Sequence, residues 1–188
     1  MRLRFAVERL RDVWQEVDRI GRQHWSETEG YHAGQAYNPD LKRYFSVDDN
    51  GWFFVVTARP LKTCLMTAPM VGYAGIYCMP SMHSQAMIAS EDFFFLENSY
   101  RQGWNAIRFL KFVEAECLRR GAVEISWTDK KGKGKLLEFL GYAKVATQWS
   151  KQSSPNPQVE VKGGADSTHA KANAVEAVDV YTESASTT

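Results

Sequence analysis

The chain has 188 residues, of which 44% are hydrophobic and 13% aromatic, which suits one domain with a sizeable core. Its formal net charge of +1 argues against nucleic acid or an acidic membrane as a partner. No apolar run reaches the ~18 residues that span a bilayer, and no signal-type apolar core follows the N-terminus. Cys64, Cys78 and Cys117 lack metal-ligand spacing, so we expect reduced thiols, no bound metal and a cytoplasmic location.

Apolar spacing and turn residues predict the order of helices and strands. The apolar residues over 7–20 recur in steps of three and four, which indicates an amphipathic helix that ends near Gly21. Asp40 is placed to cap a short helix, while Gly72 and Gly75 suggest a bulge within a strand. The predicted strands cover 3–6, 52–58, 71–79, 86–96, 122–128 and 143–150, and the predicted helices cover 7–20, 41–45, 106–120 and 136–140. This order indicates an α+β fold with a largely antiparallel sheet.

The stretch over 86–121 joins a buried strand to a helix through a short polar turn. The strand ends in the apolar run 93–96, residues 97–99 break the pattern, and Gly121 suits a helix C-terminal cap. The first turn of such a helix has backbone N–H groups without intrahelical partners and carries the positive end of the helix dipole. This stretch therefore predicts an anion site.

The loop over 100–106 resembles the acyl-CoA pyrophosphate loop of the GNAT superfamily of N-acetyltransferases. That loop reads Arg or Gln, two residues, Gly, one residue, then Gly or Ala. With Arg101 first, Trp104 stands at the first glycine and Ala106 at the last position. A shifted register would use Gly103 as the first glycine and place Asn105 at the second.

A second motif supports this resemblance, which extends over residues 4–151. Residues 136–142 end in Leu-Gly-Tyr and are similar to a short helix found late in the family. The resemblance implies a mixed, mostly antiparallel sheet flanked by helices, whose fourth and fifth strands splay apart. On this scheme the splayed strands are those over 86–96 and 122–128, and acetyl-CoA enters the gap between them.

The resemblance also implies which residues would hold acetyl-CoA. A backbone N–H near the end of the fourth strand would polarise the thioester carbonyl. The loop and the helix start would bind the pyrophosphate, and lysines of the run over 130–135 would reach the phosphates as point charges. The implied cofactor-binding residues are Phe95, Leu96, Glu97, Arg101, Gln102, Gly103, Trp104, Asn105, Ala106, Lys131 and Lys133.

Glu91 and Asp92 are the candidate general bases. A carboxylate partly buried beside phenylalanines would have a raised pKa, which suits a base near neutral pH. Strand alternation would place Asp92 beside Phe94 and Glu91 beside Phe93, on opposite faces, so at most one would face the cleft. The sequence leaves open which one it is, and His83 in the preceding loop is another possible base.

The acceptor pocket and the general acid are inferred from the resemblance alone. The tyrosine that serves as the acid in many family members corresponds to Leu137, so no acid can be carried over. The segment over 23–39 follows the first helix, as acceptor-pocket segments do in the family. Together with Asn-Pro-Asp over 38–40, its His-Trp pair is similar to a compact phage-associated subgroup. The implied acceptor-binding residues are His24, Trp25, Glu27 and Tyr31.

The composition changes after Lys151. Residues 152–188 contain one aromatic residue, Tyr181, and no arginine, and are rich in Ser, Thr, Ala, Val and Pro. This segment has too few large apolar groups to offset the entropy that it would lose on becoming ordered. We therefore predict a GNAT-like domain over 1–151 and a disordered tail over 152–188.

The expected function is acetyl-CoA-dependent N-acetyltransfer to an unidentified amine of a small molecule or a protein. If the protein is phage-encoded, it would act in the cytoplasm of a host. The alternative is a GNAT-fold binding or structural module without catalysis, which Trp104 and Leu137 favour. Nucleic-acid binding is a weaker interpretation, because lysines without arginine or interleaved aromatics give only salt-sensitive contacts. The oligomeric state is left open, a homodimer being one possibility.

Overall fold

The computed structural model describes residues 2–29, 36–61, 68–128 and 134–146. The chain divides into two units, Met1–Val145 and Ala146–Thr188, and every helix and strand reported below belongs to the first. The predicted tail over 152–188 lies outside the described residues, so the tail and its boundary at Lys151 stay predictions. In the part that is described, no helix is both long and apolar enough to cross a membrane.

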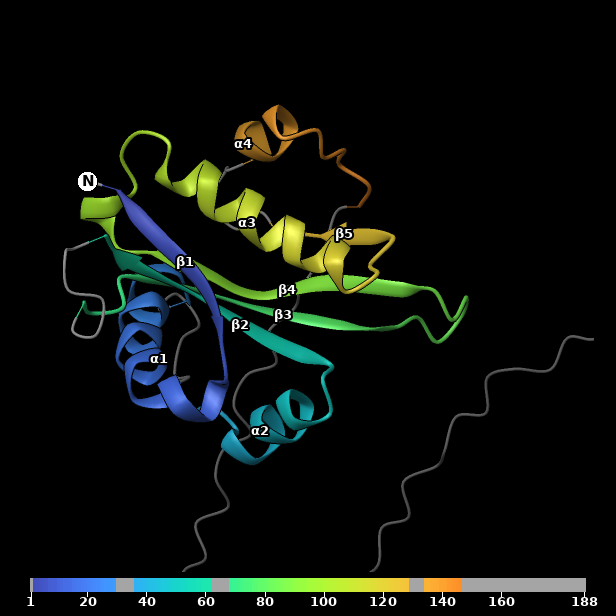
Figure 1. The fold of residues 1–188 in the computed structure, drawn as a ribbon, viewed down its shortest axis with the longest axis horizontal. Helices are drawn as coiled ribbons and strands as arrows, with labels where there is room; N and C mark the ends of the chain where they lie inside the picture. The colour runs from blue at the N-terminus through green and yellow to red at the C-terminus, as the bar shows by residue number, and fades with distance from the viewer. Residues whose placement is uncertain (1, 30–35, 62–67, 129–133, 147–188) are drawn as a thin grey trace, which may run out of the picture. The chain divides into compact units, whose positions relative to one another are not determined.

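A five-stranded sheet forms the centre of this unit (Figure 1). Its strands lie side by side in chain order, each antiparallel to the next except the last pair, which is parallel. The prediction of a mixed, mostly antiparallel α+β sheet is therefore confirmed. The strands are β1 (Leu3–Glu8), β2 (Phe53–Pro60), β3 (Gly72–Pro80), β4 (Met87–Leu96) and β5 (Glu124–Ser126).

Helices cover both faces of the sheet and enclose two apolar cores (Figure 1). Val17 of α1 packs in the core that contains Phe53, with residues of α2 at its edge. Cys117 of α3 packs in the other core, with Phe54. Two neighbouring residues of β2 thus serve opposite cores, as strand alternation requires. The helices are α1 (Leu10–His24), η1 (Trp25–Glu29, π-helical), α2 (Leu41–Asp49), η2 (Asn98–Tyr100, a 3₁₀ turn), α3 (Asn105–Arg119) and α4 (Gly134–Phe139).

The first two helices extend past their predicted C-terminal ends, and α1 begins later than predicted, at Leu10, because Val7 and Glu8 belong to β1. α1 continues through Gly21, which is buried and so close to Tyr37 that an added Cβ would collide with the tyrosine hydroxyl. The glycine is therefore explained by close packing and not by the end of a helix. The carboxylate of Asp40 caps α2 as predicted and accepts a hydrogen bond from the Arg43 N–H at 3.1 Å.

The C-terminal part of the sheet is shorter than predicted. β5 covers only Glu124–Ser126 of the expected strand over 122–128. The strand predicted over 143–150 is wrong for residues 143–146, which are irregular, and its remaining residues lie outside the described part of the chain.

β3 and β4 change register at one position. Gly75 lies opposite Phe93, but the next residue of β3, Ile76, lies opposite Glu91, so Asp92 is the extra residue of a β-bulge. The ring of Phe93 lies over Gly75, where an added Cβ would be 2.6 Å from the ring Cε1 atom. The predicted bulge is therefore present, and on β4 it falls on a predicted catalytic residue.

Arg59 of β2 connects α1 to the sheet. Its guanidinium makes two hydrogen bonds to the Glu16 carboxylate, at 2.6 and 2.9 Å, and a third to the Ala68 carbonyl at 3.0 Å. Glu8 lies 3.4 Å away, and Glu16 also accepts the Met70 N–H at 2.7 Å. Because the Arg59 side chain is only 11% exposed, these contacts are what satisfies its charge.

We predict that Glu16→Gln lowers the free energy of unfolding at neutral pH by about 1.5–3 kcal/mol, the range for hydrogen bonds to a charged group. Burial raises the pKa of Glu16, but the bonds from Arg59 and the Met70 N–H lower it by more, to below its ordinary value of 4.5. The contribution is therefore present above about pH 4.5 and is lost as the pH falls through the lowered pKa. Urea unfolding from pH 7 to pH 3 should show the parent and the variant converging in acid.

Asp49→Asn is the matched control, since it removes the ion pair between Asp49 and Arg11, which is exposed on both sides. The control should leave the urea midpoint nearly unchanged. If Glu16→Gln and Asp49→Asn lower the free energy of unfolding equally, the contact between Arg59 and Glu16 stabilises the fold no more than an exposed ion pair does.

We also predict that Gly75→Ala costs about 1–3 kcal/mol of stability, because the new methyl group overlaps the packed ring of Phe93. Adding Phe93→Leu should recover part of that loss, since leucine lacks the ring atoms that collide. A double-mutant cycle in urea measures this coupling. If the stability losses of the two substitutions are strictly additive, the Phe93 ring and Gly75 are not energetically coupled and the prediction is wrong.

Candidate functional site

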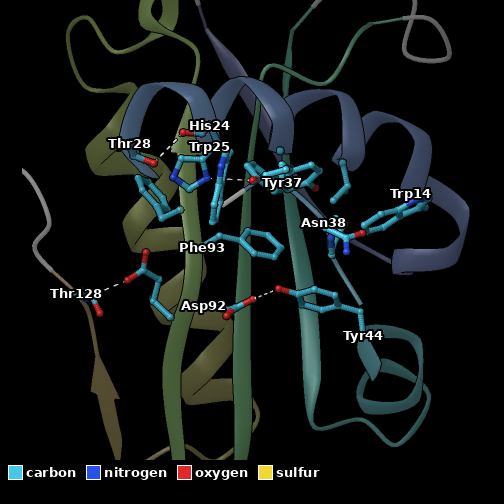
Figure 2. Close-up of a pocket in the computed structure, with 17 residues that line it drawn as sticks. Trp14, His24, Trp25, Thr28, Tyr37, Asn38, Tyr44, Asp92, Phe93 and Thr128 are labelled. Carbon is cyan, nitrogen blue, oxygen red and sulfur yellow. Dashed lines mark hydrogen bonds between the residues drawn. The ribbon is translucent and has the colours of Figure 1, made fainter. Parts of the chain in front are cut away.

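A pocket of about 480 Å³ lies between α1, the segment that follows it, α2 and the bulged part of β4 (Figure 2). Its volume falls in the range of about 300–1,000 Å³ typical of small-molecule sites. Aromatic side chains form nearly half of its lining, and two carboxylates lie on its sheet side. The lining residues are Trp14, Val17, Gly21, His24, Trp25, Thr28, Ala36, Tyr37, Asn38, Pro39, Tyr44, Tyr73, Glu91, Asp92, Phe93, Phe94 and Thr128.

Both candidate bases, Glu91 and Asp92, line this pocket. The Oδ2 atom of Asp92 accepts a hydrogen bond from the Tyr44 hydroxyl at 2.6 Å (Figure 2). The Oε2 atom of Glu91 accepts one from the Thr128 N–H, just beyond β5, at 3.0 Å. The prediction that only one of the two acids could face the cleft is therefore wrong.

The bulge accounts for the position of Asp92, whereas Glu91, which lies opposite Ile76, lines the pocket beside Thr128, where pairing with β5 has ended. Asp92 and Phe93 both turn toward the side of α1 and α2, where Phe93 stacks on Tyr73 with ring centroids 4.4 Å apart. Phe94 packs on the opposite side, 4.9 Å from the ring of Phe109 in α3. Asp92 thus shares a face with Phe93 and not with Phe94, because the extra residue interrupts the alternation.

Two of the predicted acceptor-binding residues form the upper wall of the pocket. The Nδ1 atom of His24 lies 3.0 Å from the Tyr73 hydroxyl, and the His24 ring stacks on Phe95 at 4.9 Å. Trp25 is tilted against Tyr37, with ring centroids 6.2 Å apart. The end of α1 and the start of η1 therefore contribute an aromatic wall.

The tyrosine hydroxyls of the pocket stay protonated at neutral pH. Burial, with a further contribution from Asp92, raises the pKa of Tyr44 above its ordinary value. Burial likewise raises the pKa of Tyr73 well above its ordinary value, and burial together with Asp18 raises the pKa of Tyr37 to about 12. These groups can donate hydrogen bonds but do not supply a base.

The sequence predictions did not identify Trp14, Tyr44 and Tyr73 as site residues. They lie on two helices and an inner strand, far apart in the sequence. One signal was present, because Tyr73 and Tyr77 share a face of β3 with Gly75 between them. Aromatic residues that carry a hydroxyl, repeated on an inner strand, indicate a half-polar pocket and not a plain core.

β4 leaves β5 beside this pocket. Pairing between the two strands ends at Ser90 and Ser126, while β4 continues to Leu96. The Glu97 N–H donates to the Val71 carbonyl at 2.8 Å, toward β3. Because antiparallel residues alternate in direction, the backbone groups of Leu96 point to the opposite edge and those of Phe95 do not. The amide expected to polarise the thioester carbonyl was placed among residues 95–97. Of these three residues, only Leu96 directs its backbone N–H toward the β5 side.

Arg101 does not lie with the start of α3. Its Nε atom donates to the Leu96 carbonyl at 2.5 Å, and its guanidinium forms an ion pair with Glu27 of η1 at 2.7 Å. It also lies over the ring of Phe95, 5.0 Å from the centroid. Arg101, predicted to bind the cofactor, is therefore paired with Glu27, predicted to bind the acceptor. Glu27 does not line the pocket.

The rest of the predicted loop surrounds the start of α3. Gly103 adopts the left-handed conformation with a φ of 65°, and Trp104 is the N-cap residue, 60% exposed and without a side-chain capping bond. Asn105 is buried and donates to the Tyr100 carbonyl at 3.1 Å. A shallow hollow of about 490 Å³ lies here, lined by Arg2, Gln102, Gly103, Trp104, Asn105 and Arg108. Ala106 instead packs against the apolar core that contains Cys117 of α3.

Several remaining candidates lie elsewhere. Tyr31, Lys131 and Lys133 are outside the described residues. His83 is exposed in the turn between β3 and β4 and does not line the pocket. Among the residues that are described, no group of three or more His, Cys, Asp or Glu side chains could hold a metal ion.

Comparison with known proteins gives matches to solved structures. No known family profile and no curated sequence matches the chain. The ribosomal-protein-alanine N-acetyltransferase of Brucella melitensis biovar Abortus 2308 matches with a TM-score of 0.60 and 14% identity, over 82% of this chain and 100% of that one. An aminoglycoside acetyltransferase, meta-AAC0020, from an uncultured soil sample and in complex with sisomicin, matches with a TM-score of 0.57 and 13% identity, over 80% and 97%.

A third similar structure contains a cofactor. It is a "predicted acetyltransferase" of Clostridium acetobutylicum with acetyl-CoA, matched with a TM-score of 0.58 and 17% identity, over 81% of this chain and 96% of that one. Nothing in these likenesses points to the phage-associated subgroup, which stays a prediction of the sequence. Identities this low establish the fold and leave the acceptor undetermined. The chain has the α+β fold of the GNAT acetyltransferases.

Proposed function

We propose that the chain is an acetyl-CoA-dependent N-acetyltransferase whose acceptor amine binds in the aromatic pocket. The observation that carries this proposal is the position of Glu91 and Asp92, two carboxylates on the pocket wall where β4 parts from β5. The fold adds support, because the similar structures include acetyltransferases named for different acceptors.

The carboxylates supply the proton transfer that the reaction needs. An amine attacks a thioester only in its neutral form, so a base must take its proton. Asp92, held by the Tyr44 hydroxyl among aromatic rings, is our first choice, and Glu91, held by the Thr128 N–H, is the second. In the transfer, the nitrogen bonds to the acyl carbon, the C–S bond breaks, and the departing thiolate takes up a proton.

The start of α3 has features that suit the phosphates of acetyl-CoA, which supplies the acyl group as a thioester. The side chain of the N-cap residue Trp104 makes no capping hydrogen bond, and Arg2 and Arg108 line the same hollow. The outward backbone of Leu96 is our choice for the group that polarises the acyl oxygen. Two features suit the cofactor less well, namely the ring of Trp104 at the glycine position and the pairing of Arg101 with Glu27.

These two features motivate the second candidate, a GNAT-fold module that binds a partner and has no catalytic role. It differs from the first candidate in one measurable property, the binding of acetyl-CoA. The cofactor should therefore be tested before any acceptor.

We predict that calorimetric titration of the full chain with acetyl-CoA gives binding in the micromolar range. Trp104→Gly should bind several-fold more tightly, because removing the exposed ring opens the surface in front of the first N–H groups of α3. If neither protein gives heat or a thermal shift at millimolar acetyl-CoA, the transferase proposal fails and the module is favoured.

We further predict that Asp92→Asn lowers kcat/KM by about 10²–10⁴-fold, the range for loss of a general base. Glu91→Gln should have a smaller effect, and both variants should still bind acetyl-CoA. Steady-state rates across pH measure the difference. Rates equal to the parent in both variants would remove the base hypothesis.

A further inference from the structure

The last residue of β4, Leu96, is held by the sheet on one side. The Glu97 N–H donates to the Val71 carbonyl at 2.8 Å, and the Glu97 carboxylate lies 3.4 Å from the Arg19 guanidinium of α1. On the other side, pairing with β5 covers only residues 88–90 of β4. β5 therefore does not fix the open side of Leu96, which carries the N–H that we choose for polarising the acyl oxygen.

Arg101 contacts this open side. Its Nε atom donates to the Leu96 carbonyl at 2.5 Å, and its Nη2 atom donates to the Glu27 carboxylate at 2.7 Å. The guanidinium also lies over the buried ring of Phe95, 5.0 Å from the centroid. The N–H and the carbonyl of a strand residue point to the same edge, so a bond to the Leu96 carbonyl also restricts the direction of the Leu96 N–H. A carbonyl, a carboxylate and a ring face suit the flat, forked guanidinium better than an ammonium group.

The same contacts direct Arg101 away from the hollow at the start of α3. The described residues that line this hollow include Arg2 and Arg108 but not Arg101. To reach a phosphate there, the Arg101 guanidinium would give up its bonds to the Leu96 carbonyl and the Glu27 carboxylate. The resemblance implies that Arg101 binds the cofactor, whereas its geometry fits a contact to the backbone of β4.

We infer that Arg101 is a positioning residue, which orients the Leu96 N–H toward the acyl oxygen of acetyl-CoA and does not bind the phosphates. This inference rests on the proposed function, in which the Leu96 N–H polarises that oxygen. Through Glu27, Arg101 also ties η1 to this end of β4. η1 begins at Trp25, a residue of the pocket wall, so Arg101 joins the proposed acceptor side to the backbone that would activate the acyl group.

The test measures two properties of acetyl-CoA bound to the full chain, and neither measurement needs an acceptor amine. Calorimetric titration gives the Kd, and infrared spectroscopy with an isotopic label at the acetyl carbonyl carbon gives the stretching frequency of the thioester carbonyl. A hydrogen bond from a protein donor polarises the carbonyl and lowers this frequency. Arg101→Gln should change the Kd by less than about threefold, because no phosphate contact is lost. The carbonyl frequency should shift back toward that of free acetyl-CoA, because the Leu96 N–H is no longer held in direction.

Arg11→Gln is the matched control. The Arg11 guanidinium likewise pairs with a carboxylate, that of Asp49, and lies over a ring, that of Phe45. Because this pair joins α1 to α2 and not to β4, Arg11→Gln should change neither the Kd nor the carbonyl frequency. Arg101→Lys keeps the positive charge without the forked donors, so it should bind acetyl-CoA as the parent does and show an intermediate frequency. The lysine variant also serves as the test if Arg101→Gln does not fold.

The outcomes separate this inference from the function on which it rests. A larger rise in the Kd of Arg101→Gln, toward the tenfold or more that loss of a charged hydrogen bond causes, would assign Arg101 to the phosphates and overturn the inference. A carbonyl frequency equal to that of the parent in both Arg101 variants would also overturn it. If the parent binds acetyl-CoA with the frequency of the free cofactor, the inference and the role of Leu96 fail, while cofactor binding stands. Absence of binding by the parent would sink the proposed function and the inference together.

Discussion

The change of register between β3 and β4 is the constraint on which the site depends. If Phe93–Leu96 kept their present register, a regular strand would send Asp92 to the side of α3, into an apolar core where a carboxylate would lose its hydration. The extra residue instead turns Asp92 toward α2, where the Tyr44 hydroxyl donates to it. Gly75 permits this arrangement because the ring of Phe93 occupies the space that a side chain would need. Gly75 on β3 therefore leaves room for Phe93 at the bulge, where Asp92 and Phe93 lie on one face of β4.

Two arginines then hold the helical wall of the pocket against the sheet. Arg59 ties α1 to β2 through Glu16, with its side chain almost fully covered. Arg101 ties η1 to the open edge of β4 through Glu27 and the Leu96 carbonyl. A buried guanidinium is stable only when its N–H groups find acceptors, so the contacts of Arg59 restrict how far α1 can move. The Arg101 side chain is 42% exposed, so its ion pair with Glu27 adds a weaker restraint. The second contact also joins the proposed cofactor side of the site to the acceptor side.

The sequence predicted the order of the elements but only part of the site. Apolar periodicity was sufficient for the helices and for the central strands, because each buries one continuous face. It failed at Gly21, where packing of Tyr37 from a distant segment allows α1 to continue. Alternation failed at Asp92, because a bulge depends on the partner strand and leaves no periodic signal in β4 itself.

The pocket wall was harder to predict for a related reason. Tyr44 and Tyr73 lie 48 and 19 residues before Asp92, on two other elements, and they meet it only through the order of the sheet and the position of α2. By contrast, His24 and Trp25 were among the predicted acceptor-binding residues, because the resemblance assigned their whole segment to the acceptor. The structure places both on the pocket wall, and their role in binding stays a prediction.

The carboxylates and the aromatic wall of the pocket belong to parts of the chain that are packed differently. The carboxylates belong to a sheet whose register is set by core packing, so changes there disturb the fold. Most of the aromatic wall belongs to the end of α1, to the segment before α2 and to α2 itself. In these three parts the described lining residues are partly buried or exposed, except Val17 and Gly21, which are buried. Such positions can change without opening a cavity in either core. The proposed base and the surface proposed to contact the acceptor are thus carried by different parts of the chain.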